Sequence, residues 1–235
     1  MNLRDKISYD SEGVYDLDPA IVSAELRKVI LQCIQVQKES AKTALASFQP
    51  NAMSSHEVSE QRLNQILDHG NDIHGIASDK DISNVITFSA KNIEDAILDP
   101  AVEKSRINVD REITRLVKAL FSNNSKLSIT SSGHLWYPPG SYMGWHTNSK
   151  VPGWRIYVNY AEQEGKSFFR YRDPDTRKIV TLNDKHWNIR IFRISRDKPL
   201  WHAIYSDTHR FSMGYMVFQE SRLTRALNKL KRLFR

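Results

Sequence analysis

Hydrophobic residues follow two different patterns, and the change between them falls near residue 122. In the first part, apolar residues recur every three or four positions, the spacing of one face of an α-helix. This spacing predicts helices over 18–48, 57–69 and 110–121. Asp18 and Pro19 open the first of these with a favourable cap and first-turn residue. Between the later two helices, the weaker pattern indicates a strand at 82–90 and a helical turn at 93–98.

From residue 126 onward, aromatic and β-branched residues come in short runs separated by turn residues such as Pro138-Pro139-Gly140. The predicted strands are 126–137, 154–160, 167–172, 178–182, 187–194, 200–204 and 210–218. Short strands at regular spacing favour a double-sheet roll or a barrel. We therefore expect an α+β protein with a mainly helical region over 1–122, packed on a β core over 123–220. A basic amphipathic helix is expected over 221–235.

Composition narrows the class of protein. The chain has 235 residues, enough for one full core, with 40% hydrophobic and 26% charged residues. No apolar run approaches the roughly 18 to 20 residues of a membrane span, so no transmembrane segment is expected. The N-terminus is polar and does not resemble a secretory signal. A single cysteine, Cys33, suits a reducing compartment, and we expect a cytoplasmic protein.

The net charge of +7 is unevenly distributed along the chain. Residues 1–122 carry 14 Lys and Arg against 19 Asp and Glu, whereas residues 123–220 carry 14 against 8. The last fifteen residues carry 6 basic residues and no acidic one. A basic pocket suits an anionic small molecule, and a basic tail suits nucleic acid, a membrane surface or an acidic partner.

Candidate chemistry gathers in the second half of the chain. His146 follows the Pro-Pro-Gly turn, and His202 lies on a later predicted strand. Two histidines and usually a carboxylate on one face form the ligand set of non-heme Fe(II). Arg210 can hold a carboxylate with two parallel hydrogen bonds, and Ser212, two residues on, faces the same side of the strand.

In this order, the residues resemble the motif of the Fe(II)/2-oxoglutarate-dependent dioxygenases, over roughly residues 126–218. That family pairs a proximal His-x-Asp/Glu with a distal His and an Arg-x-Ser, which here match His146-Thr147-Asn148, His202 and Arg210-Phe211-Ser212. The resemblance implies a double-stranded β-helix (a jelly roll) core, with Fe(II) and 2-oxoglutarate as cofactors. It also implies a hydroxyl contact from Tyr137 to the co-substrate, for which a packed core tyrosine is the alternative.

Asn148 departs from this pattern, because it stands where the family has a carboxylate ligand. The amide can be a weak iron ligand or an outer hydrogen-bond donor, or it can mark a site that has lost catalysis. The chain is also similar to the aspartyl/asparaginyl β-hydroxylase branch, which works with two histidines and no carboxylate. That similarity makes Arg155 a candidate for a second contact to 2-oxoglutarate. The alternative is that Arg155 is an ordinary strand residue exposed to solvent.

These observations favour an oxidoreductase, a metal-binding hydroxylase acting on a C–H bond of a peptide, an amino acid or a small metabolite. The first alternative is a non-catalytic jelly-roll binding module with a degraded iron site. The second is a nucleic-acid dealkylase, which is disfavoured because Met216 stands where repair members of the family carry another arginine. Neither the substrate nor the oligomeric state follows from the sequence.

Overall fold

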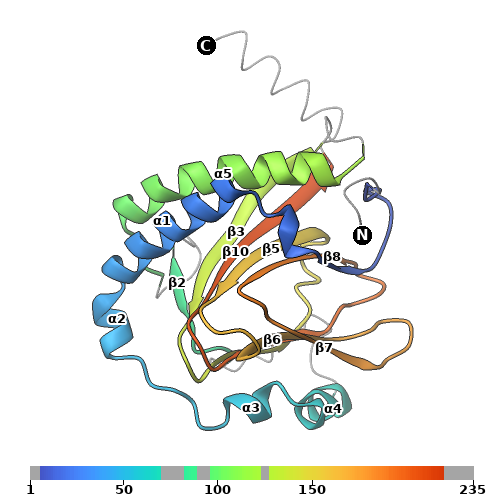
Figure 1. The fold of residues 1–235 in the computed structure, drawn as a ribbon. Coiled ribbons are helices and arrows are strands. Elements are labelled where there is room, and N and C mark those ends of the chain that lie inside the picture. Colours follow the sequence, from blue (N-terminus) through green and yellow to red (C-terminus); the bar gives the residue numbers. More distant parts are fainter. Residues whose placement is uncertain (1–5, 70–81, 89–95, 123–126, 220–235) are drawn as a thin grey trace.

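Two antiparallel sheets form the centre of the molecule (Figure 1). The computed structural model describes residues 6–69, 82–88, 96–122 and 127–219. The larger sheet has six strands in the order β1-β8-β5-β10-β3-β2, and the smaller has four in the order β4-β9-β6-β7. The large sheet comprises β1 (Val14–Leu17), β2 (Ile86–Phe88), β3 (Leu127–Tyr137), β5 (Gly153–Ala161), β8 (Trp187–Ile194) and β10 (Arg210–Gln219). The small sheet comprises β4 (Ser141–His146), β6 (Ser167–Arg172), β7 (Ile179–Asn183) and β9 (His202–Ser206).

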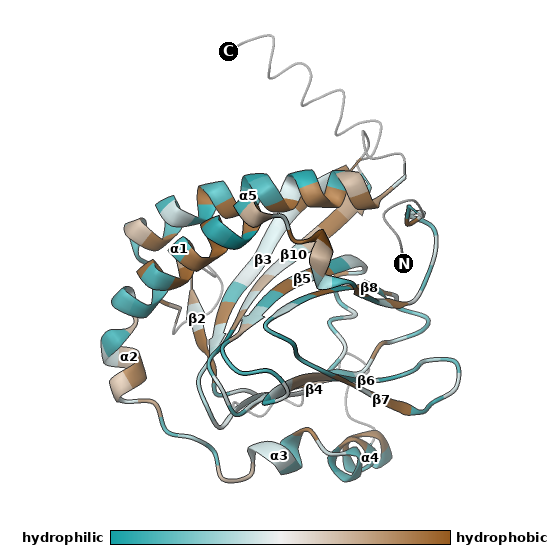
Figure 2. Cartoon of the chain, viewed as in Figure 1, coloured by the Kyte–Doolittle hydropathy of each residue, from teal (hydrophilic) through white to brown (hydrophobic). Residues whose placement is uncertain are grey.

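Two long helices, α1 (Ala24–Ser40) and α5 (Pro100–Leu120), lie beside the large sheet (Figure 1). Ser23 begins α1, because its hydroxyl accepts a hydrogen bond from the Leu26 N–H at 3.1 Å. Asp99 begins α5 in the same way, with Pro100 in the first turn. Hydrophobic and hydrophilic residues alternate along both helices (Figure 2), and the buried ones join one core cluster with the large sheet. A short 3-10 turn, η1 (Pro19–Ile21), precedes α1, and α2 (Lys42–Ala46) follows it.

The two faces of the large sheet have different surroundings because side chains alternate along each strand. On β5, Trp154, Ile156 and Val158 join the cluster shared with the helices. On the same strand, Tyr157 and Asn159 point the other way and line a cavity. The space between the sheets therefore receives polar side chains such as Asn159 together with apolar ones such as Phe192.

Two short helices, α3 (Ser54–Glu57) and α4 (Glu60–Asp68), lie near the small sheet (Figure 1). Leu63 and Ile66 of α4 belong to an apolar cluster with Trp145 and Trp201. The indole N–H of Trp145 donates to the Ser59 carbonyl at 2.8 Å. These contacts bury the side of β4 that does not face the large sheet.

The α+β class is confirmed, and several predicted element bounds are corrected. Asp18 caps only the 3-10 turn η1, and α5 begins at Pro100 instead of residue 110. Strands β1 and β4 were not predicted, and β9 runs over 202–206 instead of 200–204. The expected helix at 221–235 and residues 93–95 of the expected helical turn lie outside the described residues. Within the described part of the chain, no helix is long and apolar enough to cross a bilayer.

Candidate functional site

A small buried cavity of ≈ 30 Å³ lies between the two sheets. Residues from seven strands line it, and polar groups gather on it from both sheets. The lining residues are Leu135, Tyr137, Met143, His146, Tyr157, Asn159, Phe169, Arg190, His202, Ile204, Arg210 and Ser212. Five of the residues predicted as site residues thus meet at one place, namely Tyr137, His146, His202, Arg210 and Ser212.

The two histidines stand side by side at the edge of the small sheet. His146 ends β4 and His202 begins β9, and they are paired across the two strands. Their ring centroids are 4.1 Å apart, and their exposed fractions are 6% and 1%. The His146 Nδ1 lies 2.8 Å from the Gly144 carbonyl oxygen, and the His202 Nδ1 lies 2.9 Å from that of Leu200. Because a carbonyl only accepts, each Nδ1 carries the proton and each Nε2 keeps a lone pair for a ligand.

Burial keeps both rings neutral. It lowers the pKa of His146, although the hydrogen bond to the Gly144 carbonyl opposes the shift. The pKa of His202 is lowered further by burial and then by the neighbouring His146. A metal binds neutral imidazole, so both rings are in the ligating form at neutral pH.

Asn148 lies beside the histidine pair in a left-handed backbone conformation with φ of 56°. Its Nδ2 is 3.3 Å from the Nε2 of His202, so the amide donates to the ring's lone pair. In the part of the chain that the structure describes, no three His, Cys, Asp or Glu side chains cluster as a metal site. The third polar group beside the pair is the Asn148 amide.

Arg210 provides a buried positive charge on the opposite sheet. Arg210 is 2% exposed, and its guanidinium carbon lies 5.0 Å from the centroid of the Tyr137 ring. Its Nε donates to the Asp184 carboxylate at 2.8 Å. Its buried Nη1 has no hydrogen-bond partner among the described residues. A buried, charged donor without a partner is costly, and an anionic ligand would satisfy it.

Asp184, which sequence reasoning missed, fixes Arg210 in place. It follows β7, is buried, and accepts hydrogen bonds from Arg190, Arg210 and the Ser167 hydroxyl. Burial acts to raise the pKa of Asp184, but Arg210 and Arg190 outweigh it and hold the pKa below its usual value. Nothing local in Asn183-Asp184-Lys185 distinguishes this residue from an ordinary turn aspartate.

Asn159 is a second residue that the sequence reasoning missed. It is 1% exposed, lies opposite Ser212 in the sheet, and neither its Oδ1 nor its Nδ2 has a partner in the described chain. Buried amides are nearly always hydrogen-bonded, so two open groups facing a cavity indicate a ligand or ordered water. The signal was an asparagine within a strand of mostly aromatic and branched residues, where asparagine is disfavoured.

Tyr137 and Arg155 end up in different surroundings. The Tyr137 hydroxyl lies in the cavity, 3.9 Å from the Met143 sulfur, and burial raises its pKa. Arg155 shares the strand face of Tyr157, but its guanidinium donates to the carbonyls of Val151 and Trp154. It is not among the described residues that line the cavity.

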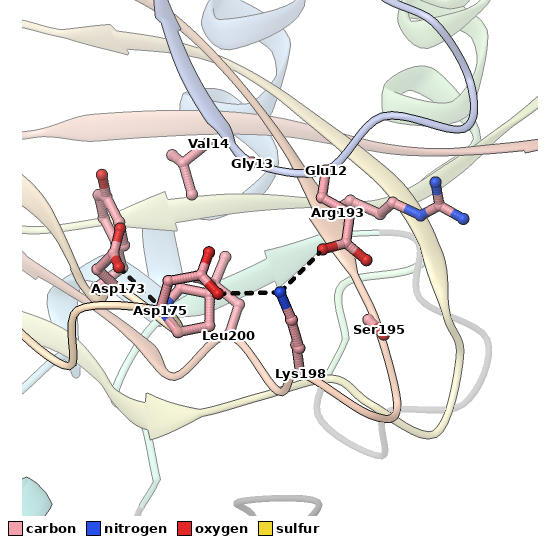
Figure 3. A pocket seen from close by; sticks show the side chains of 11 residues that line it. Glu12, Gly13, Val14, Asp173, Asp175, Arg193, Ser195, Lys198 and Leu200 are labelled. Carbon is pink, nitrogen blue, oxygen red and sulfur yellow. Dashed lines mark hydrogen bonds and ion pairs between the residues drawn. The ribbon is translucent and has the colours of Figure 1, made fainter.

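A second, more open cleft of ≈ 200 Å³ is lined in part by Leu200, two residues before His202 in the sequence (Figure 3). Lys198 bridges its rim through ion pairs to Glu12 at 3.7 Å and Asp175 at 2.9 Å. Val14, Tyr171 and Leu200 line the cleft and belong to an apolar cluster. Two members of that cluster, Phe169 and Phe192, contact the His202 ring. Because the Leu200 carbonyl also accepts from His202, one wall of the cleft is shared with the histidine site.

No family model and no curated protein matches the chain. Among solved structures, it is similar to a Pseudomonas putida prolyl-4-hydroxylase, with 11% identity, a TM-score of 0.48, and 90% of this chain and 94% of that one covered. It is also similar to a Trichoplax adhaerens prolyl hydroxylase, solved with a hypoxia inducible factor peptide. The identity is 12%, the TM-score is 0.48, and 93% of this chain and 88% of that one are covered. A third similar structure is a Burkholderia pseudomallei oxidoreductase of the 2OG-Fe(II) oxygenase family. The identity is 11%, the TM-score is 0.42, and 71% of this chain and 84% of that one are covered. Likeness at this level does not assign an activity to the chain.

Proposed function

We propose that the chain is an Fe(II)- and 2-oxoglutarate-dependent oxygenase that hydroxylates a C–H bond of a peptide, an amino acid or a small metabolite. One observation carries the proposal. Two neutral histidines whose Nε2 atoms carry lone pairs share a cavity with a buried arginine that has an open Nη1. The two histidines can bind a metal, and the arginine can bind a carboxylate. The cavity is therefore suited to an acid that chelates the metal.

The strand order supports a double-stranded β-helix. Along the chain from β3 to β10, successive strands pass from one sheet to the other, except at the β6–β7 hairpin. Apart from β7, which pairs only with β6, these strands pair antiparallel with strands that are distant in the sequence, such as β10 with β3 and β5. This winding carries His146, His202 and Arg210 onto facing walls.

The metal end of the site is formed by the chain's own donors. In the proposal, His146 and His202 hold Fe(II), and their Nδ1–H bonds to backbone carbonyls fix ring orientation. Asn148 lies within reach as a neutral third ligand or as a hydrogen-bond donor. Bound iron would supply the oxidising chemistry, with oxygen as the oxidant and 2-oxoglutarate as the electron donor that becomes succinate and carbon dioxide.

The anion end of the site binds the distal carboxylate of 2-oxoglutarate in the proposal. Arg210 contributes the charge, and Ser212 and Asn159 contribute neutral hydrogen-bonding groups from adjacent strands. The cavity is smaller than 2-oxoglutarate, so binding moves side chains outward. Met143 can do so because its side chain is unbranched and flexible. Filling the cavity also excludes water from the metal end.

The primary substrate reaches the metal end through the cleft of Figure 3 in the proposal. The cleft shares Leu200 with the histidine site, and its lining combines apolar residues with charged ones at the rim. Such a lining suits a ligand with an apolar body and polar ends, which includes peptides, amino acids and small metabolites. Arg155 remains a proposed second contact near the anion or substrate, although its present bonds are to carbonyls.

The alternative is a binding module that uses the same cavity without turnover, and the amide at Asn148 favours it. Anaerobic titration of Fe(II) with and without 2-oxoglutarate tests the site, through the charge-transfer absorption band of the iron–2-oxoglutarate pair. We expect a band that is lost in His146→Ala and kept in His186→Ala, a variant outside the cavity. A folded protein without a band contradicts the proposal. Succinate formation in air then separates an oxygenase from the binding module.

A further inference from the structure

Three buried charges lie together at the anion end of the cavity, and two of them are positive. Arg190 and Arg210 are 1% and 2% exposed, and the Asp184 side chain between them is fully buried. One carboxylate oxygen contacts the Arg190 Nη1, and the other contacts the Arg210 Nε at 2.8 Å. Asp16 lies 3.2 Å from Arg190, but its side chain is 44% exposed, so solvent screens its charge.

The hydrogen bonds leave an open donor on one of the two arginines. Arg190 also donates to the carbonyls of Leu182 at 3.2 Å and Asn183 at 3.4 Å. The Nη1 of Arg210, in contrast, has no partner among the described residues. The three buried groups therefore carry one net positive charge, and the open donor that a ligand can reach belongs to Arg210.

Asp184 is held in a fixed position by the backbone as well as by its side-chain contacts. The Ser167 hydroxyl donates to its carboxylate at 2.6 Å, and the Asp184 N–H donates to the Ser167 carbonyl at 2.8 Å. It lies behind Arg210 and is not among the residues that line the cavity. Asp184 thus acts on a ligand through Arg210 and through its own negative charge.

We propose that Asp184 sets the charge of the ligand that the cavity accepts. Its carboxylate reduces two guanidinium charges to one, so the site binds a singly charged carboxylate in preference to a doubly charged phosphate or phosphonate. Arginine alone does not make this distinction, because guanidinium pairs well with both groups. The inference rests on the proposed function and concerns the selectivity of its anion end.

A pair of matched ligands tests the proposal in the full chain loaded with Mn(II). The dissociation constant of 2-oxoglutarate is compared by calorimetry with that of its analogue in which a phosphonate replaces the distal carboxylate, at a pH where the phosphonate is doubly charged. We expect the native protein to favour 2-oxoglutarate, and Asp184→Asn to shift the ratio by about tenfold or more toward the phosphonate. Asp16→Asn, which removes the exposed carboxylate, is the control and should shift it by less than about threefold.

Two further variants separate charge from packing. Arg190→Gln should shift the ratio in the opposite direction, and the double variant Asp184→Asn/Arg190→Gln should return it near the native value. If Asp184 only maintained the shape of the site, adding Arg190→Gln to Asp184→Asn would not restore the native affinity ratio. If Asp184→Asn does not fold, Arg190→Gln and the double variant still test the direction.

The outcomes also separate this inference from the proposed function. A native protein that binds neither ligand overturns both. A protein that binds 2-oxoglutarate, but whose ratio is the same in the folded Asp184 and Arg190 variants, overturns the charge inference alone.

Discussion

Replacing Arg210 by methionine tests the anion end of the cavity directly. The substitution keeps most of the side-chain volume and removes the charge, including the open Nη1. Asp184 keeps Arg190 and the Ser167 hydroxyl as partners, so its carboxylate does not become isolated. We therefore expect the variant to fold, and its loss of binding to report on the missing guanidinium.

The magnitude follows from the burial of Arg210. A unit charge about 4 Å from a carboxylate contributes about 4 kcal/mol at an effective dielectric constant of about 20. Measured losses for charged hydrogen bonds are smaller, about 1.5–3 kcal/mol. Since about 1.4 kcal/mol is a factor of ten, a loss of about 1.5–3 kcal/mol should lower the affinity for 2-oxoglutarate about ten- to a hundredfold.

Anaerobic titration of the Fe(II)-loaded protein with 2-oxoglutarate measures this loss. Arg196→Met serves as the matched control, because Arg196 is exposed and does not line the cavity. We expect the control to bind as the native protein does, and Fe(II) to bind both variants equally well. An Arg210→Met protein that is folded and keeps its affinity within about threefold would refute the assignment of this residue.

Three other substitutions probe the site and the core. Asn148→Asp should tighten Fe(II) binding at least about tenfold in equilibrium dialysis, because a carboxylate adds a charge beside the histidines; unchanged affinity would mean that residue 148 does not lie at the metal. Asn159→Leu should weaken 2-oxoglutarate binding about tenfold and leave the melting temperature equal or higher, since it removes two unpartnered buried groups; a large drop in melting temperature would indicate that water or protein satisfies them. Burial lowers the pKa of His134 well below its usual value, so below about pH 6.5 the unfolded chain binds a proton that the folded one does not. Stability should then fall as the pH is lowered, by up to about 1.4 kcal/mol per pH unit from this residue, and His134→Gln should reduce the slope in urea titrations at several pH values.

The sequence predicted most strands of the core because their runs of aromatic and β-branched residues are bounded by strong turn signals. It failed at β4, whose residues are mostly buried on both sides, so hydrophobic and polar positions do not alternate. The clusters around Trp145 and around His202 cover the two faces of this strand. Burial on both faces comes from tertiary contacts, which a local pattern does not reveal.

For the candidate site, the sequence predicted the residues that belong to a recognisable motif with a fixed order along the chain. His146, His202 and Arg210 lie on one cavity because the chain winds between the two sheets. Asp184 and Asn159 had no such spacing to mark them. Asp184 depends on partners from β6, β8 and β10, and these contacts exist only once the strands are paired.

The conformation of Asn148 separates the needs of the backbone from those of the site. Its φ of 56° is left-handed, a region that Asn and Asp both enter more readily than other side chains. The backbone at this position therefore does not require an amide in place of a carboxylate. What the amide changes is the charge beside His202, with the same side-chain size and within the same 3.3 Å reach. Compared with a site that has a carboxylate at position 148, a site with two histidines and an amide depends more on the chelating co-substrate for the free energy of metal binding. Affinity for Fe(II) should therefore depend more strongly on 2-oxoglutarate in the native protein than in Asn148→Asp.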